Sequence, residues 1–367
     1  MQKKLEVNLA LQGGGAHGAF TWGVIDRLLE DDRLKFGWIS ATSAGAVNAV
    51  ALAAGLAEGT REKARAKMFA VWQAVHKAGV PDLTRLYPFL NGLSRQPALA
   101  HMATMWSPYD FNPLGFDPLR RLLSDHIDFE LIREKSPVEL LIAATHVSSG
   151  RVRFFRRHDV SVDAVLASAC LPTMHHAVKI DGEAYWDGGY SANPDLVTLG
   201  VESPVQDTLI VLLAPRELNE LPTSVQDIAN HVNRLTFNAP LLRDVEVITA
   251  VRESSGSILT KGRLSRLAKH RYHIIDAAEF TGSMHPETSI KPDWGVITYL
   301  HGAGQAMAEK WLATSRASIG KAETADLARH FFPDVAGAAS RNGGATVKQG
   351  RSKVAASVLP RKAKAAE

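Results

Sequence analysis

Apolar segments separated by glycine-rich turns open the chain. Residues 5–11 are mostly apolar and run into a glycine cluster, which predicts a buried strand. Apolar residues then recur at helical spacing in residues 16–30, and a short strand at 36–41 and a small-residue helix at 44–56 follow. This order of strand, turn and helix, occurring twice, predicts a mainly parallel sheet covered by helices.

The same reasoning extends over the rest of the chain. It predicts further elements: a helix at 61–78, a strand at 139–146, a helix at 160–170, a hairpin at 178–186, strands at 208–214 and 272–275, a helix at 223–253 interrupted at Pro240, and a helix at 295–319. Residues 80–118 hold six prolines and several aromatic residues, which predicts an irregular excursion. That excursion is either a lid for acyl chains or ordinary packing over the helices.

The charge is distributed unevenly. From Arg341 onward the chain has seven Lys or Arg and one acid, Glu367, so the tail carries +6 and the remainder carries +4 − 6 = −2. Residues 333–367 also lack apolar periodicity, which predicts a disordered basic tail. A nucleic-acid-binding domain would place its basic excess on the folded part, so no nucleic-acid partner is expected. The charged run at 261–271 is best explained as a solvated helix face, and the alanines of the tail are typical of an inert segment. Contact with an anionic lipid surface is the alternative for both segments.

Composition excludes several classes of protein. The single cysteine, Cys170, leaves no internal disulfide and no cysteine-based zinc site. The first residues lack the apolar stretch of a signal peptide, and no segment approaches the length of a membrane span, so we expect a cytoplasmic protein. No pair of His or acidic residues has convincing ligand spacing, and neither a metal nor a cofactor is expected.

The first chemical motif is the turn Gly13-Gly14-Gly15-Ala16-His17-Gly18, between a strand and a helix. Backbone N–H groups at a helix start are unpaired and carry partial positive charge, so they can bind a phosphate or a tetrahedral oxyanion. The turn also has the Gly-x-Gly-x-x-Gly spacing of a dinucleotide site. That alternative requires an acid at the end of the second strand, where this chain has Ile39-Ser40-Ala41.

The second motif is Ala41-Thr42-Ser43-Ala44-Gly45, again between a strand and a helix. A nucleophile elbow needs small residues two positions before and after its serine, and Ser43 has Ala41 and Gly45 there. Taken alone, Ser43 is better explained as a helix N-cap, and the nearby glycine loop is what favours the nucleophile. The third motif, Asp187-Gly188-Gly189, follows the hairpin and taken alone is a common turn.

Together, the three motifs resemble the patatin-like phospholipase family in kind and in order, over residues 6–200. The segments 167–172 and 187–194 also resemble that family. The resemblance implies a three-layer α/β/α fold with a mainly parallel sheet. Residues 201–332 lie beyond it and are expected to form an α/β extension packed on the same body. This chain has His17 where the family usually has Arg or Lys, and Ala41 where the family usually has Gly.

The resemblance also implies a lipid acyl-ester hydrolase with a Ser–Asp dyad. Ser43 would attack the ester carbonyl, Asp187 would act as the general base, and the N–H groups of Gly14 and Gly15, with Gly13, would form the oxyanion hole. Elbow and loop support would come from a further set of residues: Ala41, Gly45, His17, Gly18, Gly188 and Gly189. Burial would have to raise the pKa of Asp187 for the carboxylate to serve as a base.

Three alternatives stay open. A catalytically weak lipid-binding or scaffold protein could keep the same fold, and a nucleotide-binding protein could use the loop at Gly13–Gly18. A catalytic histidine would restore the usual triad, with these candidates: His146, His175, His176, His231, His270, His273, His285 and His301. Of these, His273 lies on an apolar strand and is expected in the core, whereas His175 and His176 are candidates for gating the substrate.

Overall fold

A single mixed sheet organises the protein. The computed structural model describes residues 4–78, 107–215, 221–254, 262–290 and 292–333. The eight strands have the order β5-β6-β3-β2-β1-β7-β8, with β4 pairing separately with β3. Their bounds are Leu5–Leu11 (β1), Leu34–Ala41 (β2), Glu139–His146 (β3), Val152–Arg156 (β4), Val178–Ile180 (β5), Glu183–Asp187 (β6), Asp207–Leu212 (β7) and Arg271–Asp276 (β8).

The centre of the sheet is parallel. Strands β3, β2, β1, β7 and β8 all run in the same direction, whereas β4 and β6 pair antiparallel with β3, and β5 pairs antiparallel with β6. Because parallel strands end at one edge, the turns that follow β1 and β2 meet there. The two glycine-containing motifs at 13–18 and 41–45 are those turns.

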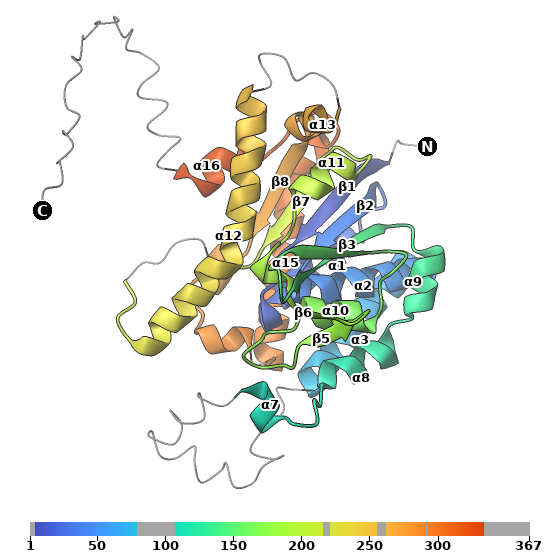
Figure 1. Ribbon diagram of the computed structural model, residues 1–367. Helices are drawn as coiled ribbons and strands as arrows, with labels where there is room; N and C mark the ends of the chain where they lie inside the picture. The colour runs from blue at the N-terminus through green and yellow to red at the C-terminus, as the bar shows by residue number, and fades with distance from the viewer. Residues whose placement is uncertain (1–3, 79–106, 216–220, 255–261, 291, 334–367) are drawn as a thin grey trace, which may run out of the picture.

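Helices cover both faces of the sheet (Figure 1). On β1, Leu9 and Leu11 belong to one apolar core and Ala10 to the other, as the alternation of side chains along a strand requires. Helices α1 (Gly18–Leu28), α2 (Ala44–Ala57), α3 (Arg61–Ala78), α10 (Val162–Ser168) and α15 (Trp294–Ser315) contribute to the first core. Helices α11 (Val197–Glu202), α12 (Val225–Ser254), α13 (Arg263–Lys269) and α16 (Leu327–Phe331) contribute to the second. The predicted three-layer α/β fold is therefore confirmed.

Short elements complete the described chain. They are α7 (Pro108–Phe111), α8 (Pro118–His126), α9 (Phe129–Lys135), α14 (Ala278–Thr281) and four 3-10 turns, at Gly15–His17, Gly188–Tyr190, Pro286–Ser289 and Arg316–Ser318. None of the helices within the described ranges combines the length and apolarity needed to cross a bilayer.

Most predicted elements are confirmed, but the structure differs from the prediction at Pro240 and in several short elements. The predicted interruption of a helix at Pro240 is wrong, because α12 continues through it and only bends in Figure 1. A proline removes one backbone donor, and the neighbouring turns of a long helix can tolerate that loss as a kink. Sequence reasoning also missed β4 and five short helices: α8, α9, α11, α14 and α16. Residues 80–106 of the predicted excursion and all of the tail after residue 333 lie outside the described residues.

Candidate active site

Ser43 lies at the sharp turn between β2 and α2. Its φ of 54° and ψ of −122° place a non-glycine residue in a strained region of backbone space. A β-carbon added at Gly45 would lie 2.3 Å from the carbonyl oxygen of Leu11, so only glycine fits at that position. Ser43 occupies the N-cap position of α2, yet its hydroxyl accepts no capping hydrogen bond. The turn therefore has the geometry of a nucleophile elbow rather than of an ordinary cap.

Two side chains from distant segments hold this elbow. The Ser168 hydroxyl, which is fully buried, accepts a hydrogen bond from the Ser43 N–H at 3.0 Å. The Thr42 hydroxyl donates to the carbonyl of Ala192 at 2.7 Å. Both bonds link the strained turn to the region around Asp187, which offsets part of the cost of the strain.

Asp187 ends β6 and is completely buried. Strand register brings it near Ser43, because β3 pairs Ile142 with Ala41 and Ala144 with Asp187. Its Oδ1 accepts a hydrogen bond from the Gly189 N–H at 2.7 Å. Its Oδ2 is also buried but has no hydrogen-bond partner among the described residues. That oxygen is therefore available to accept a proton.

Burial raises the pKa of Asp187 from 3.8 to about 7. The Gly189 N–H and the Ser43 side chain oppose part of this rise, since both favour the ionised carboxylate. Ser43 is thus close enough to stabilise the charge, although its hydroxyl does not complete a hydrogen bond to Oδ2 in this structure. A carboxylate with a pKa near neutrality is a much better base for a serine hydroxyl than an ordinary aspartate.

The glycine loop lies directly beside the elbow. A β-carbon added at Gly13 would lie 2.9 Å from the β-carbon of Ser43. The Gly13 N–H donates to Asn193 Oδ1 at 2.8 Å, so it already has a partner. The N–H groups of Gly14 and Gly15 have no hydrogen-bond acceptor within the described part of the chain. Among the described residues, the N–H groups of the loop that remain free are therefore those of Gly14 and Gly15.

Gly15 and the predicted support residues Gly18 and Ala41 lie where the loop and the elbow are closely packed. Gly15 has a φ of 56°, and a β-carbon there would lie 2.1 Å from the carbonyl oxygen of Ser289. A β-carbon at Gly18 would lie 2.7 Å from that of Ala44, where α1 approaches α2. Ala41, at the end of β2, is completely buried. Each of these positions therefore accepts only a small residue.

The two glycines after Asp187 meet similar limits. A β-carbon at Gly188 would lie 2.2 Å from the carbonyl oxygen of Ala143, and one at Gly189 would lie 2.3 Å from the ring of Phe237. The Asp-Gly-Gly segment is thus required by close packing against β3 and α12.

His17 does not add a positive charge to the loop. Its Nε2 lies 2.8 Å from the Thr288 hydroxyl, and burial lowers the pKa of the imidazole to about 4. The side chain is therefore neutral at physiological pH. Any electrostatic stabilisation by the loop comes from its backbone N–H groups and the start of α1.

No histidine among the described residues hydrogen-bonds to Ser43 or Asp187. The histidines contact other groups: His146 contacts Ser149 and Glu183, His176 the carbonyl of Pro108, His231 Arg234, His270 Thr208, and His301 Asp26. His273 is buried between Thr324 and Asp207, as expected for a core residue. His175 is largely buried, which lowers its pKa, and His176 stacks on Tyr109 at 4.1 Å. Their suggested gating role stays a prediction.

Sequence reasoning missed Ser168 and Asn193 as supports of the site. Both lie in segments that were singled out for their family resemblance, but no role was assigned to either. Their hydrogen bonds to Ser43 and Gly13 span 125 and 180 residues of chain. Periodicity and local spacing carry no signal for contacts at such separations.

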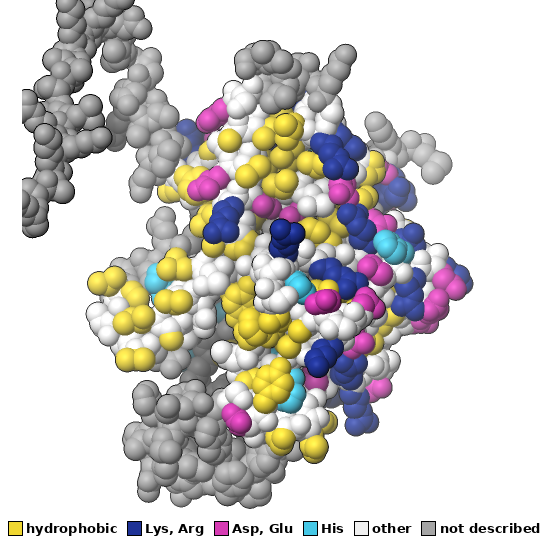
Figure 2. Space-filling model, viewed as in Figure 1, with side chains coloured by type: hydrophobic (Ala, Val, Ile, Leu, Met, Phe, Trp, Pro, Cys, Tyr) yellow, Lys and Arg dark blue, Asp and Glu magenta, His cyan; other side chains and the backbone are white. Residues whose placement is uncertain are grey.

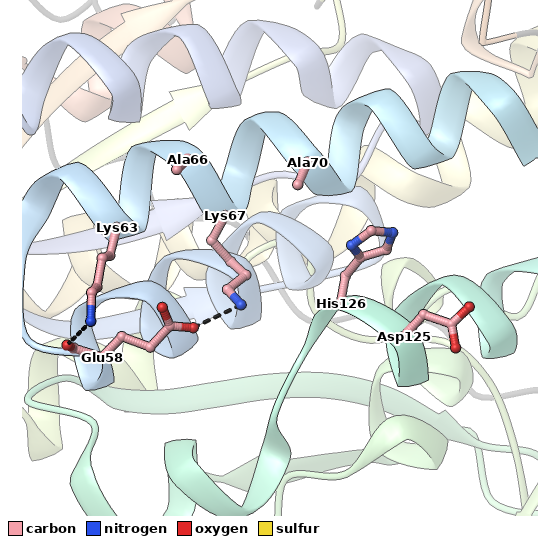
Figure 3. Close-up of a pocket in the computed structure, with 7 residues that line it drawn as sticks. All are labelled: Glu58, Lys63, Ala66, Lys67, Ala70, Asp125 and His126. Atoms are coloured by element: carbon pink, nitrogen blue, oxygen red, sulfur yellow. Dashed lines mark hydrogen bonds and ion pairs between the residues drawn. The ribbon is translucent and has the colours of Figure 1, made fainter.

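A surface cavity elsewhere in the molecule has a different chemistry (Figure 3). It measures about 260 Å³ and lies between α3, the end of α2 and the end of α8. Glu58 accepts from both lysines that point into it, through its carboxylate from Lys67 and through its backbone carbonyl from Lys63. The described residues also contain no cluster of three or more potential metal ligands.

Comparison with known proteins gives a family model that matches about half of the chain and solved structures of low identity. A family model described as patatin-like phospholipase matches residues 9–199. No curated protein sequence matches significantly. Among solved structures, VipD from Legionella pneumophila is 15% identical, with 91% of this chain and 74% of VipD covered and a TM-score of 0.40. The ExoU–SpcU complex of the Pseudomonas aeruginosa type III secretion system gives 15% identity, coverages of 92% and 60%, and a TM-score of 0.31.

Proposed function

Because the chain belongs to the patatin-like phospholipase family, we propose that it hydrolyses lipid acyl esters with Ser43 as the nucleophile and Asp187 as the general base. One observation carries the proposal. A fully buried carboxylate with an unpaired oxygen lies beside a serine that is held in a strained elbow. Ordinary packing or turn formation requires neither feature.

The reaction begins with acylation. The Ser43 Oγ attacks the ester carbonyl while its proton passes to Asp187 Oδ2. The N–H groups of Gly14 and Gly15 donate to the oxyanion of the tetrahedral intermediate. Collapse of that intermediate expels the alcohol, which takes the proton from Asp187, and leaves an acyl-enzyme.

Deacylation reverses these roles. Asp187 takes a proton from water, and the resulting hydroxide attacks the acyl carbonyl at the same oxyanion site. When the second intermediate collapses, the carboxylic acid leaves and Ser43 recovers the proton from Asp187. A single carboxyl group thus serves as base and acid in both halves of the reaction.

The elbow geometry also bears on the nucleotide-binding alternative. That alternative needs an acid at the end of β2, but β2 ends at Ala41 and leads into the strained Ser43. The Gly13 N–H, which could otherwise contact a pyrophosphate, donates to Asn193. These features favour an oxyanion of acyl transfer over a bound dinucleotide.

Hydrolysis of p-nitrophenyl esters of several acyl lengths tests the proposal. Ser43→Ala and Asp187→Asn should each remove nearly all turnover, because each removes one member of the dyad. Asp181→Asn and Ser149→Ala are matched controls, since Asp181 starts the neighbouring Asp-Gly turn and Ser149 contacts a histidine. Both controls should retain wild-type activity.

Two outcomes would contradict the proposal. Turnover by Asp187→Asn at the wild-type rate would remove Asp187 from the mechanism. A wild-type protein that is folded and binds liposomes but hydrolyses no ester would instead favour the scaffold alternative.

A further inference from the structure

The N-terminal half of α12 carries an exposed apolar stripe. Val225, Ile228, Val232 and Leu235 are 77%, 46%, 53% and 54% exposed, although aliphatic residues usually face the core. At about 100° per residue, these four positions fall within an arc of about 80° on the helix. They therefore form one continuous face, which we call the α12 stripe.

The stripe points away from the protein body. Phe237 and Asn238, before the bend at Pro240, contact Tyr190 and Gln12 of the body, and Phe237 lies on the opposite side of the helical wheel. Beyond the bend, the buried core residues lie on that opposite side as well: Leu241, Val245 and Ile248. Asp227 and Arg234 also lie on that opposite side. The outward face is thus apolar, the reverse of an ordinary surface helix. In Figure 2, hydrophobic side chains spread over the projecting lobe that this half-helix forms, whereas charged side chains gather elsewhere on the view.

The same half-helix is bonded to the candidate active site. The carbonyl of Phe237 accepts from Asn193 Nδ2 at 3.1 Å, and the other end of that side chain holds the Gly13 N–H. The amide of Gln12 donates to Asn238 Oδ1 at 3.2 Å. The Phe237 ring contacts Tyr190, with 4.8 Å between the ring centroids. Two side-chain bridges therefore connect the glycine loop to the helix that carries the stripe.

The size and chemistry of the stripe indicate what could cover it. Four side chains are far fewer than the about 20–30 residues and about 800 Å² that each partner contributes to a stable protein–protein interface. An amphipathic helix can, however, bind a lipid surface by burying a single apolar face about 5–10 Å deep. The stripe has no charged side chain that could form an ion pair with a protein or a polyanion. The surface that matches its chemistry is therefore the acyl-chain region of a lipid aggregate.

We propose that the α12 stripe docks the protein on the surface of a lipid aggregate, beside the site that would hydrolyse its esters. This inference rests on the proposed function only for the identity of the substrate. The docking itself needs no turnover, because it depends on apolar burial. The bridges through Asn193 and Gln12 keep the glycine loop in a fixed relation to the docked helix.

Flotation with phosphatidylcholine vesicles tests the docking in the full-length Ser43→Ala protein, which cannot change the lipid. Adding Val232→Glu or Ile228→Glu should lower the partition coefficient at least tenfold, because each places a charge within the stripe. Val247→Glu is the matched control, since Val247 is an exposed valine on the same helix beyond Pro240. It should bind within twofold of the parent.

Salt separates apolar docking from attraction to the basic segments. Raising NaCl from 0.1 to 0.5 M should leave binding unchanged, whereas electrostatic binding would weaken. Three results would overturn the inference: no binding by the parent, equal binding by the Val232→Glu and Ile228→Glu proteins, or binding that disappears at 0.5 M NaCl. In an active background, Val232→Glu should hydrolyse a soluble short-chain ester at the wild-type rate and vesicle phosphatidylcholine at least tenfold more slowly. If the wild-type protein hydrolyses neither the short-chain ester nor vesicle phosphatidylcholine, the proposed function is refuted. The flotation result would still decide the docking inference.

Discussion

Replacing Asp187 by asparagine should remove activity and at the same time stabilise the folded protein at alkaline pH. The substitution keeps the shape of the side chain and the acceptor for the Gly189 N–H but removes the buried charge. Burial holds the pKa of Asp187 at about 7 in the folded state, against 3.8 for the unperturbed group. The folded protein therefore binds this proton more tightly than the unfolded chain does, and wild-type stability is lost as the pH rises from about 4 to about 7.

The size of the effect follows from that difference in pKa. About three pH units correspond to about 4 kcal/mol of unfolding free energy lost by the wild type above pH 7. Between pH 5 and pH 8 the loss amounts to about 2–3 kcal/mol. Asparagine does not titrate, so the stability of the variant relative to wild type should rise by that amount over the same interval. Any constant cost of the buried amide cancels in this comparison.

Two measurements check the prediction. Urea denaturation of both proteins at pH 5 and pH 8 gives the change in relative stability. The pH dependence of kcat/KM for the wild type should show one ionisation near pH 7, with a rise of about tenfold between pH 6 and pH 8, because only the ionised carboxylate accepts the proton.

The reasoning would be refuted by a stability difference that is the same at both pH values. An acid limb near pH 4 would refute it as well, since it would mean that Asp187 titrates as an exposed carboxyl.

Three further substitutions test the elbow and the loop. The free energy of unfolding of the Ser43→Gly protein should exceed that of the Ser43→Ala protein by about 1 kcal/mol, because glycine adopts the positive φ without strain. Equal free energies of unfolding in denaturant titrations would argue against a strained elbow. Gly45→Ala should lose about 1–3 kcal/mol of stability and most esterase activity because its β-carbon meets the Leu11 carbonyl, and a fully active variant with an unchanged Tm would contradict this. Asn193→Ala should lower kcat about 10–100-fold with little change in KM, because the Gly13 N–H loses its acceptor and the loop loses its geometry; an unchanged kcat would show that the bridge does not position the loop.

Local sequence patterns were sufficient to predict the two turns to which the proposed chemistry is assigned. Ser43 lies between small residues at the spacing of an elbow, and the glycine loop follows a strand that alternates correctly between the two cores. These features are fixed within a few residues of chain, where steric limits on φ and on side-chain size operate directly. The same steric rule failed at Pro240, because the effect of a proline depends on how much helix lies on either side of it.

The environment of Asp187 could not be predicted in the same way. Its raised pKa comes from complete burial, and that burial depends on packing by segments far apart in sequence. The Asp-Gly-Gly pattern is the same whether the carboxyl is solvated or buried. The hydrogen bond from the Gly13 N–H to Asn193 could not be predicted for a related reason, since 180 residues separate the two partners.

The bridges at Gln12 and Asn193 also bear on how the protein folds. Gln12 accepts from the N–H groups of Leu213 and Ala214 and donates to Asn238, across more than 200 residues of chain. Contacts of such long range carry a large loop-closure cost. We therefore expect the loop to reach its final shape late, once β7 and α12 are in place. A partly folded or truncated chain could keep the strand, the elbow serine and native-like circular dichroism and still be inert. In refolding experiments, recovery of esterase activity should consequently lag behind recovery of secondary structure. The time at which activity returns would mark the docking of β7 and α12 onto the N-terminal half.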